Sequence, residues 1–352
     1  MTSRFLTNPP LLIFQSRSIV EGNNVRSLKI QQLAAEAIAS QIQNGNAVPQ
    51  RRFGRAEDMV SIVCLGGWHS TAHTAMNKAP EEHSFRLMHA ALDAGINFFD
   101  NAWEYHNGYA EELMGKALAM DGKRKDVFLM SKVCDRHYEG ALQHLEDSLR
   151  RLQTDYLDLW MFHELSYDND PDWLFERGAI RAAMEAKAAG KIRYIGFTGH
   201  KAPWIHNACL AKDFIWDAAL MPINAMDAHY RSFLNQVVPV CHEKGVAPIG
   251  MKALGGGWPN GRIIERMPLN PADLLGYVLS QPLASQVVGI TDLGQLEFAV
   301  NVAKSIPMSV EAQDALLESV KVEAGDGRYE TFKSTGEHDG PYHRRQHEFA
   351  VA

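Results

Sequence analysis

"MVSIVCLGG" at residues 59–67, "EEHSFRLMHAALDAG" at 81–95 and "INFFD" at 96–100 follow one another along the chain and decide the fold. The first and third runs are short, continuous apolar stretches, which is typical of strands that are buried on both faces. The middle run repeats apolar residues three and four positions apart and stops at a glycine, as an amphipathic helix does. Together the three runs predict a strand–helix–strand unit with parallel strands.

The same unit recurs along the chain as far as Ser305. The strand at 96–100 is followed by the helical run "GYAEELMGKAL", and further strand–helix pairs begin at "DVFLMSK", "YLDLWMFH", "IRYIGFTG", "AALMPIN", "VAPIGMKALGGG" and "SQVVGIT". Eight units over roughly 250 residues predict a (β/α)8 TIM barrel of the α/β class. We expect an N-terminal helical extension at 1–50, the barrel at 51–310, and a C-terminal helix and tail at 311–352 over or near the barrel mouth.

Whole-chain composition excludes several classes of protein. The 352 residues are 46% hydrophobic and 22% charged, and the formal charge of −7 comes without a long basic stripe, so nucleic-acid binding is not favoured. The cysteines form no CxxC pair and are far apart, which argues against a zinc ribbon, an iron–sulfur site or a secreted disulfide framework: Cys64, Cys134, Cys209 and Cys241. No apolar run approaches the roughly 20 residues that a membrane span needs. A cytoplasmic protein that contacts no membrane is therefore expected.

The first fifty residues differ from the rest. Apolar residues recur there at helical spacing and predict one amphipathic helix: Leu28, Leu33, Ala37, Ile38 and Ile42. "LLIF" at 11–14 is too short for a secretory core of about 7–15 residues. The segment could pack on the barrel, contact a second copy in a homo-oligomer or act as a targeting signal, and packing is the favoured interpretation.

Polar residues stand at the carboxyl ends of the predicted strands. The interval from each of these residues to the next is about the length of one strand–helix unit. The residues are Asp100, Lys132, His163, Thr198, Asn224, Lys252 and Thr291. In a TIM barrel these ends meet at one mouth, where the active site lies. Each residue alone has an ordinary explanation as a helix cap or a solvated charge, but their convergence predicts one polar site.

Three of these residues, together with Tyr105 in the loop after the strand at 96–100, suggest a particular chemistry. Asp100 and Lys132 end neighbouring strands, where an ion pair would keep Lys132 charged. A nearby ammonium favours phenolate, so Lys132 should lower the pKa of Tyr105 from about 10 toward neutrality. Tyr105 then becomes a proton donor and acceptor for an oxygen in the mouth, and His163 can hydrogen-bond the same oxygen. The set can polarise a carbonyl or deprotonate an alcohol.

The motifs that surround these residues resemble the aldo-keto reductase family. They run in order over most of the chain: "FFDNAWEY" at 98–105, "LMSKV" at 129–133, "DYLDLWMFH" at 155–163, "KIRYIGFTG" at 191–199 and "GMKALGGG" at 250–257. The resemblance implies a nicotinamide-dependent enzyme that reduces an aldehyde, ketone or sugar carbonyl, or oxidises the alcohol. It also implies catalytic roles for Tyr105 as general acid, for Lys132 and Asp100 as tuners of its pKa, and for His163 as the orienting residue.

The resemblance further implies where the cofactor NAD(P)H binds. Thr198 and Asn224 fall where the family contacts the nicotinamide carboxamide, and Met251 where many members stack an aromatic ring. The glycines of 253–257 allow close approach to the pyrophosphate. The expected cofactor-binding residues are Thr198, Gly199, Asn224, Met251, Lys252, Ala253, Leu254, Gly255, Gly289, Thr291 and Gln295.

One position departs from the family pattern. Members that prefer NADPH carry Lys and Arg after the last strand, whereas this chain has Gly289, Asp292 and Gln295 there. A carboxylate beside a phosphate is unfavourable, so the loop provides no cationic clamp for a 2′-phosphate. Use of NADH therefore stays open.

Two alternatives to a reductase match part of the sequence. His69 and His73, with His163 and Asp100, could form a metal-dependent barrel hydrolase, but no carboxylate ends the last strand and no metal site is expected. A regulatory barrel that binds a nucleotide without turnover would not need a tuned Tyr105.

The substrate pocket and the tail are less defined. Trp68 and Trp103 should line the mouth, and aromatic walls suit sugars as well as flat apolar carbonyls, so the partner expected is a small-molecule carbonyl or sugar. His343 and His347 could share one helix face and bind a metal. A tail packed across the barrel mouth or a neighbouring subunit is the favoured interpretation.

Overall fold

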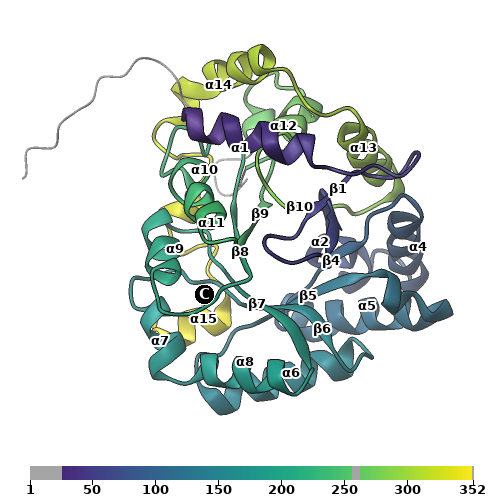
Figure 1. Cartoon of the computed structure of the whole chain (residues 1–352). Helices are drawn as coiled ribbons and strands as arrows, with labels where there is room; N and C mark the ends of the chain where they lie inside the picture. The colour runs from purple at the N-terminus through teal and green to yellow at the C-terminus, as the bar shows by residue number, and fades with distance from the viewer. Residues whose placement is uncertain (1–25, 256–261, 351–352) are drawn as a thin grey trace, which may run out of the picture.

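The central element is a closed barrel of eight parallel strands surrounded by helices (Figure 1). The computed structural model describes residues 26–255 and 262–350. The strands pair in the order β10-β3-β4-β5-β6-β7-β8-β9. Their bounds are β3 Val63–Gly66, β4 Phe98–Asp100, β5 Phe128–Val133, β6 Leu157–Phe162, β7 Ile192–Thr198, β8 Ala218–Pro222, β9 Ala247–Met251 and β10 Ser285–Val288. The predicted (β/α)8 barrel is confirmed.

Helices connect the strands and cover the outside of the barrel (Figure 1). Every residue of β5 and β6 is buried, because one face of each strand packs in the barrel interior and the other against helices. The longer helices are α4 Glu81–Asp93, α5 Tyr109–Ala119, α6 Tyr138–Arg151, α8 Ala179–Ala188, α9 Pro203–Leu210, α12 Pro271–Leu279, α13 Leu293–Lys304 and α14 Val310–Ala324. The shorter ones are α2 Gly67–Ser70, α3 Ala72–Ala75, α7 Asp170–Glu176, α10 Phe233–Gln236, α11 Val238–Glu243 and α15 Pro341–Gln346.

The apolar run at 59–67, expected to be one strand, is two. Its first part is β2 (Met59–Ser61), which pairs antiparallel with β1 (Gln50–Arg52), and only its second part, β3, enters the barrel. Ser61 marks the change, because its hydroxyl donates to the Val63 carbonyl and accepts from the backbone N–H of Phe98. A run of apolar residues alone cannot reveal such a switch.

The hairpin closes the barrel at the end opposite its mouth. Phe53, in the β1–β2 loop, packs on Phe98 and Phe128 from inside the barrel, with ring centroids 6.3 and 4.8 Å apart. The predicted N-terminal helix is α1 (Leu28–Ala39), and Ile42 lies beyond its end. This closure leaves the carboxyl ends of the strands as the open end of the barrel.

The "LLIF" run and two glycines of the "ALGGG" loop, Gly256 and Gly257, lie outside the described residues. Over the described ranges, no helix has both the length and the apolar character to cross a membrane.

Candidate active site

Four side chains meet at the mouth of the barrel. Asp100 ends β4, Lys132 lies near the end of β5, and His163 directly follows β6. The Lys132 ammonium bonds the Asp100 carboxylate, and its Nζ donates to the Asn101 carbonyl at 2.7 Å and to the Tyr105 hydroxyl at 3.1 Å. Lys132 is 1% exposed, so its charge is satisfied almost wholly by these three oxygens.

The loop that presents Tyr105 is held in an unusual backbone shape. His106 and Asn107 have φ values of 51° and 57°, and Gly108 has φ 91°. A Cβ at Gly108 would lie 2.5 Å from Cζ of Arg151, whose Nη1 donates to the Trp103 carbonyl at 2.9 Å. The polar and aromatic residues of this loop therefore form the turn that aims Tyr105 into the mouth.

The pKa of Tyr105 is shifted in the direction opposite to that expected. Burial raises it well above 10.0, and the neighbouring carboxylates Asp100 and Glu104 raise it further. The proximity of Lys132 alone predicts a lower pKa for Tyr105. Since Asp100 neutralises that lysine, the surrounding negative charge and the burial prevail. Tyr105 is therefore protonated near neutral pH and suited to donate a proton.

His163 is neutral and lies against acidic groups. Burial lowers its pKa to about 3. Its Nδ1 lies 3.0 Å from Oε1 of Glu104 and 3.8 Å from Sγ of Cys134. Glu164, the next residue, also faces the mouth, and burial raises the pKa of both glutamates.

A cavity of about 1100 Å³ opens at this point. Six of the seven strand-end residues line it, together with Tyr105. The cavity continues along the loops after β9 and β10, where it is lined by the expected cofactor residues Met251, Lys252, Ala253, Leu254, Gly255, Gly289, Thr291 and Gln295. Thr198 also lines the cavity. This space is large enough for a dinucleotide with a small substrate beside it.

Two expected cofactor residues do not line the cavity. Asn224 is fully buried, its amide donates to Glu330 at 3.0 Å, and its oxygen accepts from the backbone N–H of Asp227 at 2.9 Å. Both groups of the amide are therefore used within the protein. Gly199 is covered by a neighbouring loop, because a Cβ there would lie 2.3 Å from the Leu165 carbonyl oxygen. The strand-end pattern could not reveal either packing arrangement.

At the expected cofactor end of the cavity, cationic side chains follow β9 and none stands in the loop after β10. Lys252 (φ 61°) has no ion-pair partner within 26–255 and 262–350, and its Nζ lies 5.2 Å from the centre of the Phe332 ring. Arg262 is paired with Glu265 at 3.0 Å. After β10, Asp292 instead caps α13 by accepting from the Gln295 backbone N–H at 2.9 Å. No lysine or arginine stands between Gly289 and Gln295.

Both predicted tryptophans line the substrate side of the cavity. The Trp68 ring stacks on His106 with centroids 4.3 Å apart and meets the Tyr105 ring edge-on at 5.4 Å. Trp103 stacks on His144 at 3.6 Å. The C-terminal tail contributes further lining residues to the cavity: Phe332, His338, Gly340, Pro341, Tyr342 and Arg345.

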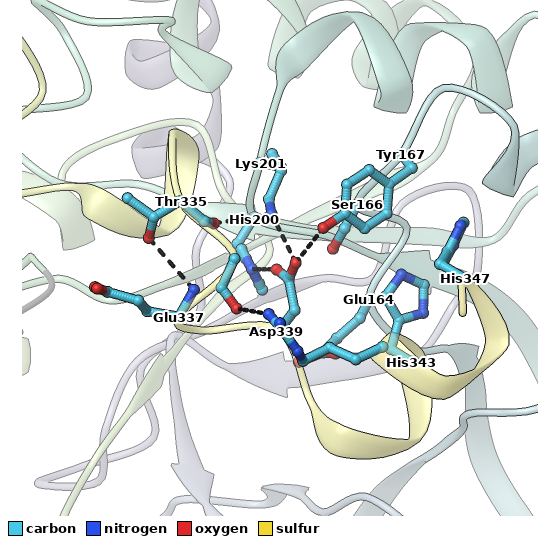
Figure 2. Close-up of polar contacts among 12 residues, drawn as sticks. Glu164, Ser166, Tyr167, His200, Lys201, Thr335, Glu337, Asp339, His343 and His347 are labelled. Carbon is cyan, nitrogen blue, oxygen red and sulfur yellow. Dashed lines mark hydrogen bonds and ion pairs between the residues drawn. The ribbon is translucent and has the colours of Figure 1, made fainter. Parts of the chain in front are cut away.

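The buried carboxylate of Asp339 holds the tail at the mouth of the barrel. Figure 2 shows Asp339 facing Tyr167, His200 and Lys201, at 2.6, 3.4 and 2.8 Å. The Gly340 N–H donates to the Glu164 carboxylate at 2.7 Å. These bonds place the tail beside the cavity that Tyr105 and His163 line.

The residues suggested for a metal hydrolase are not brought together. The His69 ring packs on Gly289, and His73 packs on His83 with ring centroids 5.5 Å apart. Within the described ranges, only two clusters have metal-ligating atoms close together: Glu104, Cys134 and His163, and Asp170, His343 and His347. The second cluster also fixes the tail, with both histidines within 3.3 Å of Asp170.

The carboxylate of Asp170 is already bonded within the protein. Asp170 accepts two backbone N–H groups at 2.8 Å, and Nε of Arg136 lies 3.6 Å from its other oxygen. The cationic Arg136 would oppose a metal ion at this point.

Sequence reasoning missed Glu104 and Glu164. Each directly adjoins a residue that was recognised, Tyr105 and His163, so adjacency in the sequence was the available signal. The tail residues gave no such signal, because no pattern says where a tail crosses a barrel.

Comparisons with known proteins identify the family of this chain. Residues 62–307 match the model of the aldo/keto reductase family. The chain is 29% identical over 232 residues to aldo-keto reductase YhdN of Bacillus subtilis, a match that covers 62% of this chain and 65% of YhdN, slightly under two thirds. It is 29% identical over 225 residues to 6-dehydroglucose reductase of Novosphingobium aromaticivorans, covering 59% of this chain and 69% of that protein.

A solved structure shows the same fold. Aldo-keto reductase AKR11C1 of Bacillus halodurans, in its holo form, aligns with a TM-score of 0.63 and 24% identity over 77% of this chain and 95% of that protein. On the family match over most of its length, this chain belongs to the aldo/keto reductase family.

Proposed function

We propose that this protein is an NAD(P)H-dependent oxidoreductase that reduces an aldehyde, ketone or sugar carbonyl to an alcohol, or catalyses the reverse reaction. The observation that supports it best is the protonated Tyr105 hydroxyl, 3.1 Å from Nζ of Lys132 in a cavity of about 1100 Å³. The printed names of relatives, such as aldo-keto reductase yakc [NADP(+)] of Schizosaccharomyces pombe and 6-dehydroglucose reductase, point to the same class of reaction.

The residues of the cavity fit a nicotinamide dinucleotide. The half-buried thioether of Met251 offers an apolar surface for a flat ring, and Lys252 is a cation without an ion-pair partner among the described residues. Thr198, the loop 253–255 and the start of α13 would hold the remaining parts. When bound, the cofactor supplies or accepts the hydride.

The protein's own part is proton transfer. Tyr105 donates its proton to the carbonyl oxygen as the oxygen becomes negative. The phenolate that remains is stabilised by the adjacent Lys132 ammonium, which the Asp100 carboxylate holds in place. For alcohol oxidation, the same phenolate accepts the proton. Trp68, whose ring meets that of Tyr105 edge-on, and the tail line the cavity around this hydroxyl.

We expect a small-molecule substrate, a cytoplasmic location, no nucleic-acid partner, and a homo-oligomer as one possible assembly.

The test is turnover of a panel of aldehydes, ketones and sugars by purified protein with NADH or NADPH, with and without a chelator. Cofactor oxidation that needs a carbonyl and is insensitive to the chelator supports the proposal. Activity that the chelator abolishes would favour the metal hydrolase alternative. Cofactor binding without turnover of any carbonyl would favour the regulatory barrel.

A further inference from the structure

Arg151, the last residue of α6, contacts the turn that carries Tyr105 on both sides of that tyrosine. Before it, Nη1 of Arg151 donates to the Trp103 carbonyl at 2.9 Å, and the guanidinium lies 5.3 Å from the centre of the Trp103 ring. After it, the guanidinium packs on Gly108, where an added Cβ would lie 2.5 Å from Cζ of Arg151. Arg151 bonds the backbone of the turn and the carboxylate of Glu111, so its influence on the Tyr105 hydroxyl is exerted through the turn.

The turn needs such support because of its backbone shape. His106 and Asn107 have φ values of 51° and 57°, in the left-handed region. That region is unfavourable for residues with a Cβ, and it persists where surrounding contacts hold the chain in place. One such contact joins the turn to β5, since the Trp103 N–H donates to the Lys132 carbonyl at 3.1 Å. The carbonyl of the same residue is the group that Arg151 holds.

Glu111, in the first turn of α5, links Arg151 to the strand that presents Lys132. Its side chain is fully buried, and Oε2 accepts from Nη1 of Arg151 at 3.2 Å. Its other oxygen, Oε1, accepts from the Ser131 hydroxyl at 2.5 Å, and Ser131 directly precedes Lys132 in β5. Nη1 has two N–H groups, and the Trp103 carbonyl and the Glu111 carboxylate use both of them. The arginine that holds the turn is therefore itself anchored on β5.

We propose that Arg151, oriented by the buried carboxylate of Glu111, is a positioning residue for proton transfer by Tyr105. It keeps the turn in place on β5, so that the Tyr105 hydroxyl stays at its distance of 3.1 Å from Nζ of Lys132. The proposal rests on the proposed function and adds to it a pair of residues that do not touch the reacting atoms. Because a misplacement of about 1 Å can cost about a hundredfold in rate, loss of this support should slow the chemical step more than it weakens binding.

The kinetic test uses the double variant Glu111→Gln with Arg151→Met, which removes both charges and leaves no buried carboxylate without its partner. The single-turnover rate of carbonyl reduction at saturating cofactor should fall by about ten- to a hundredfold, while cofactor affinity, measured by fluorescence titration, stays close to native. Glu111→Gln alone keeps the arginine and should retain most of the rate. The matched control changes the exposed pair Arg181 and Glu185 on α8 to Met and Gln, and it should leave the rate unchanged.

Hydrogen–deuterium exchange reads the turn directly and needs no turnover. In the double variant, the backbone amides of 102–108 should exchange at least about tenfold faster than in the native protein, while those of β5 keep their native rates. Exchange that is unchanged, or that speeds equally in both segments, would overturn the inference, as would a native single-turnover rate in the double variant. If the native protein reduced no carbonyl, the proposed function would fail, whereas the exchange result would still decide whether Arg151 holds the turn.

Discussion

Replacing Lys132 with methionine tests the ion pair at the centre of the site. Lys132 and Asp100 are 1% and 3% exposed, so the substitution leaves a carboxylate in the barrel without its counter-charge. Removing one partner of a buried pair costs about 3–5 kcal/mol of unfolding free energy. A surface pair is worth about 0–1 kcal/mol. We therefore expect Lys132→Met to lose at least about 3 kcal/mol at neutral pH.

The loss should depend on pH. Burial already raises the pKa of Asp100 despite the lowering effect of Lys132, and removal of Lys132 raises it further. A carboxyl group whose pKa is raised on folding stabilises the folded protein while it is protonated, below its unfolded pKa of about 3.9. This contribution to the free energy of unfolding is lost as the pH rises through the pKa of the folded state. The loss of unfolding free energy in Lys132→Met should therefore be larger at neutral pH than at mildly acidic pH.

Urea unfolding of three variants at pH 5 and 7.5 measures this. Asp100→Asn with Lys132→Met removes both charges and should be more stable than Lys132→Met alone. Lys116→Met, which breaks an exposed pair with Glu81, should stay within about 1 kcal/mol of the native protein. A Lys132→Met protein as stable as the Lys116 variant, or a double variant no better than the single, would refute a buried pair.

Other measurements test the remaining parts of the site. kcat/KM for carbonyl reduction should be flat from about pH 6 to 8, because the pKa of His163 is about 3 and that of Tyr105 lies well above 10.0; a step near pH 6.5 would show a titrating histidine. NADH should bind within about tenfold of NADPH, a gap of roughly 1.4 kcal/mol, and Gln295→Arg should shift the preference toward NADPH; a thousandfold native preference for NADPH would reveal an unrecognised cation. Gly340→Ala should raise KM several-fold, because its Cβ would lie 2.9 Å from both carboxylates, whereas Gly276→Ala, with only one neighbouring atom at 3.8 Å, should have no effect; equal kinetics for both variants would contradict the packing of the tail at the mouth.

The barrel could be predicted because each strand is a continuous apolar run and each helix repeats apolar residues three and four positions apart. Strand ends then meet by topology alone, which is why Asp100, Lys132 and His163 could be placed together. The sequence did not predict where an apolar run leaves one sheet and enters another, as the division of 59–67 at Ser61 shows. That division depends on a hydroxyl bonded to a neighbouring strand.

The electrostatics of the site required the structure. The predicted lowering of the Tyr105 pKa counted one lysine, whereas the folded chain adds burial and the charges of Glu104 and Glu164. Asn224 was placed correctly at a strand end, but its partner Glu330 comes from the far end of the sequence. Contacts between distant segments leave no periodic signal.

Proton donation by Tyr105 is the step on which the proposed reaction depends most. Tyr105→Phe keeps the ring and removes only the hydroxyl that lies 3.1 Å from Lys132. Single-turnover rates of carbonyl reduction should fall by about 10²–10⁴, while cofactor affinity, measured by fluorescence titration of the same protein, stays close to native. A Tyr105→Phe protein that reduces carbonyls at the native rate would show that Tyr105 is not the proton donor.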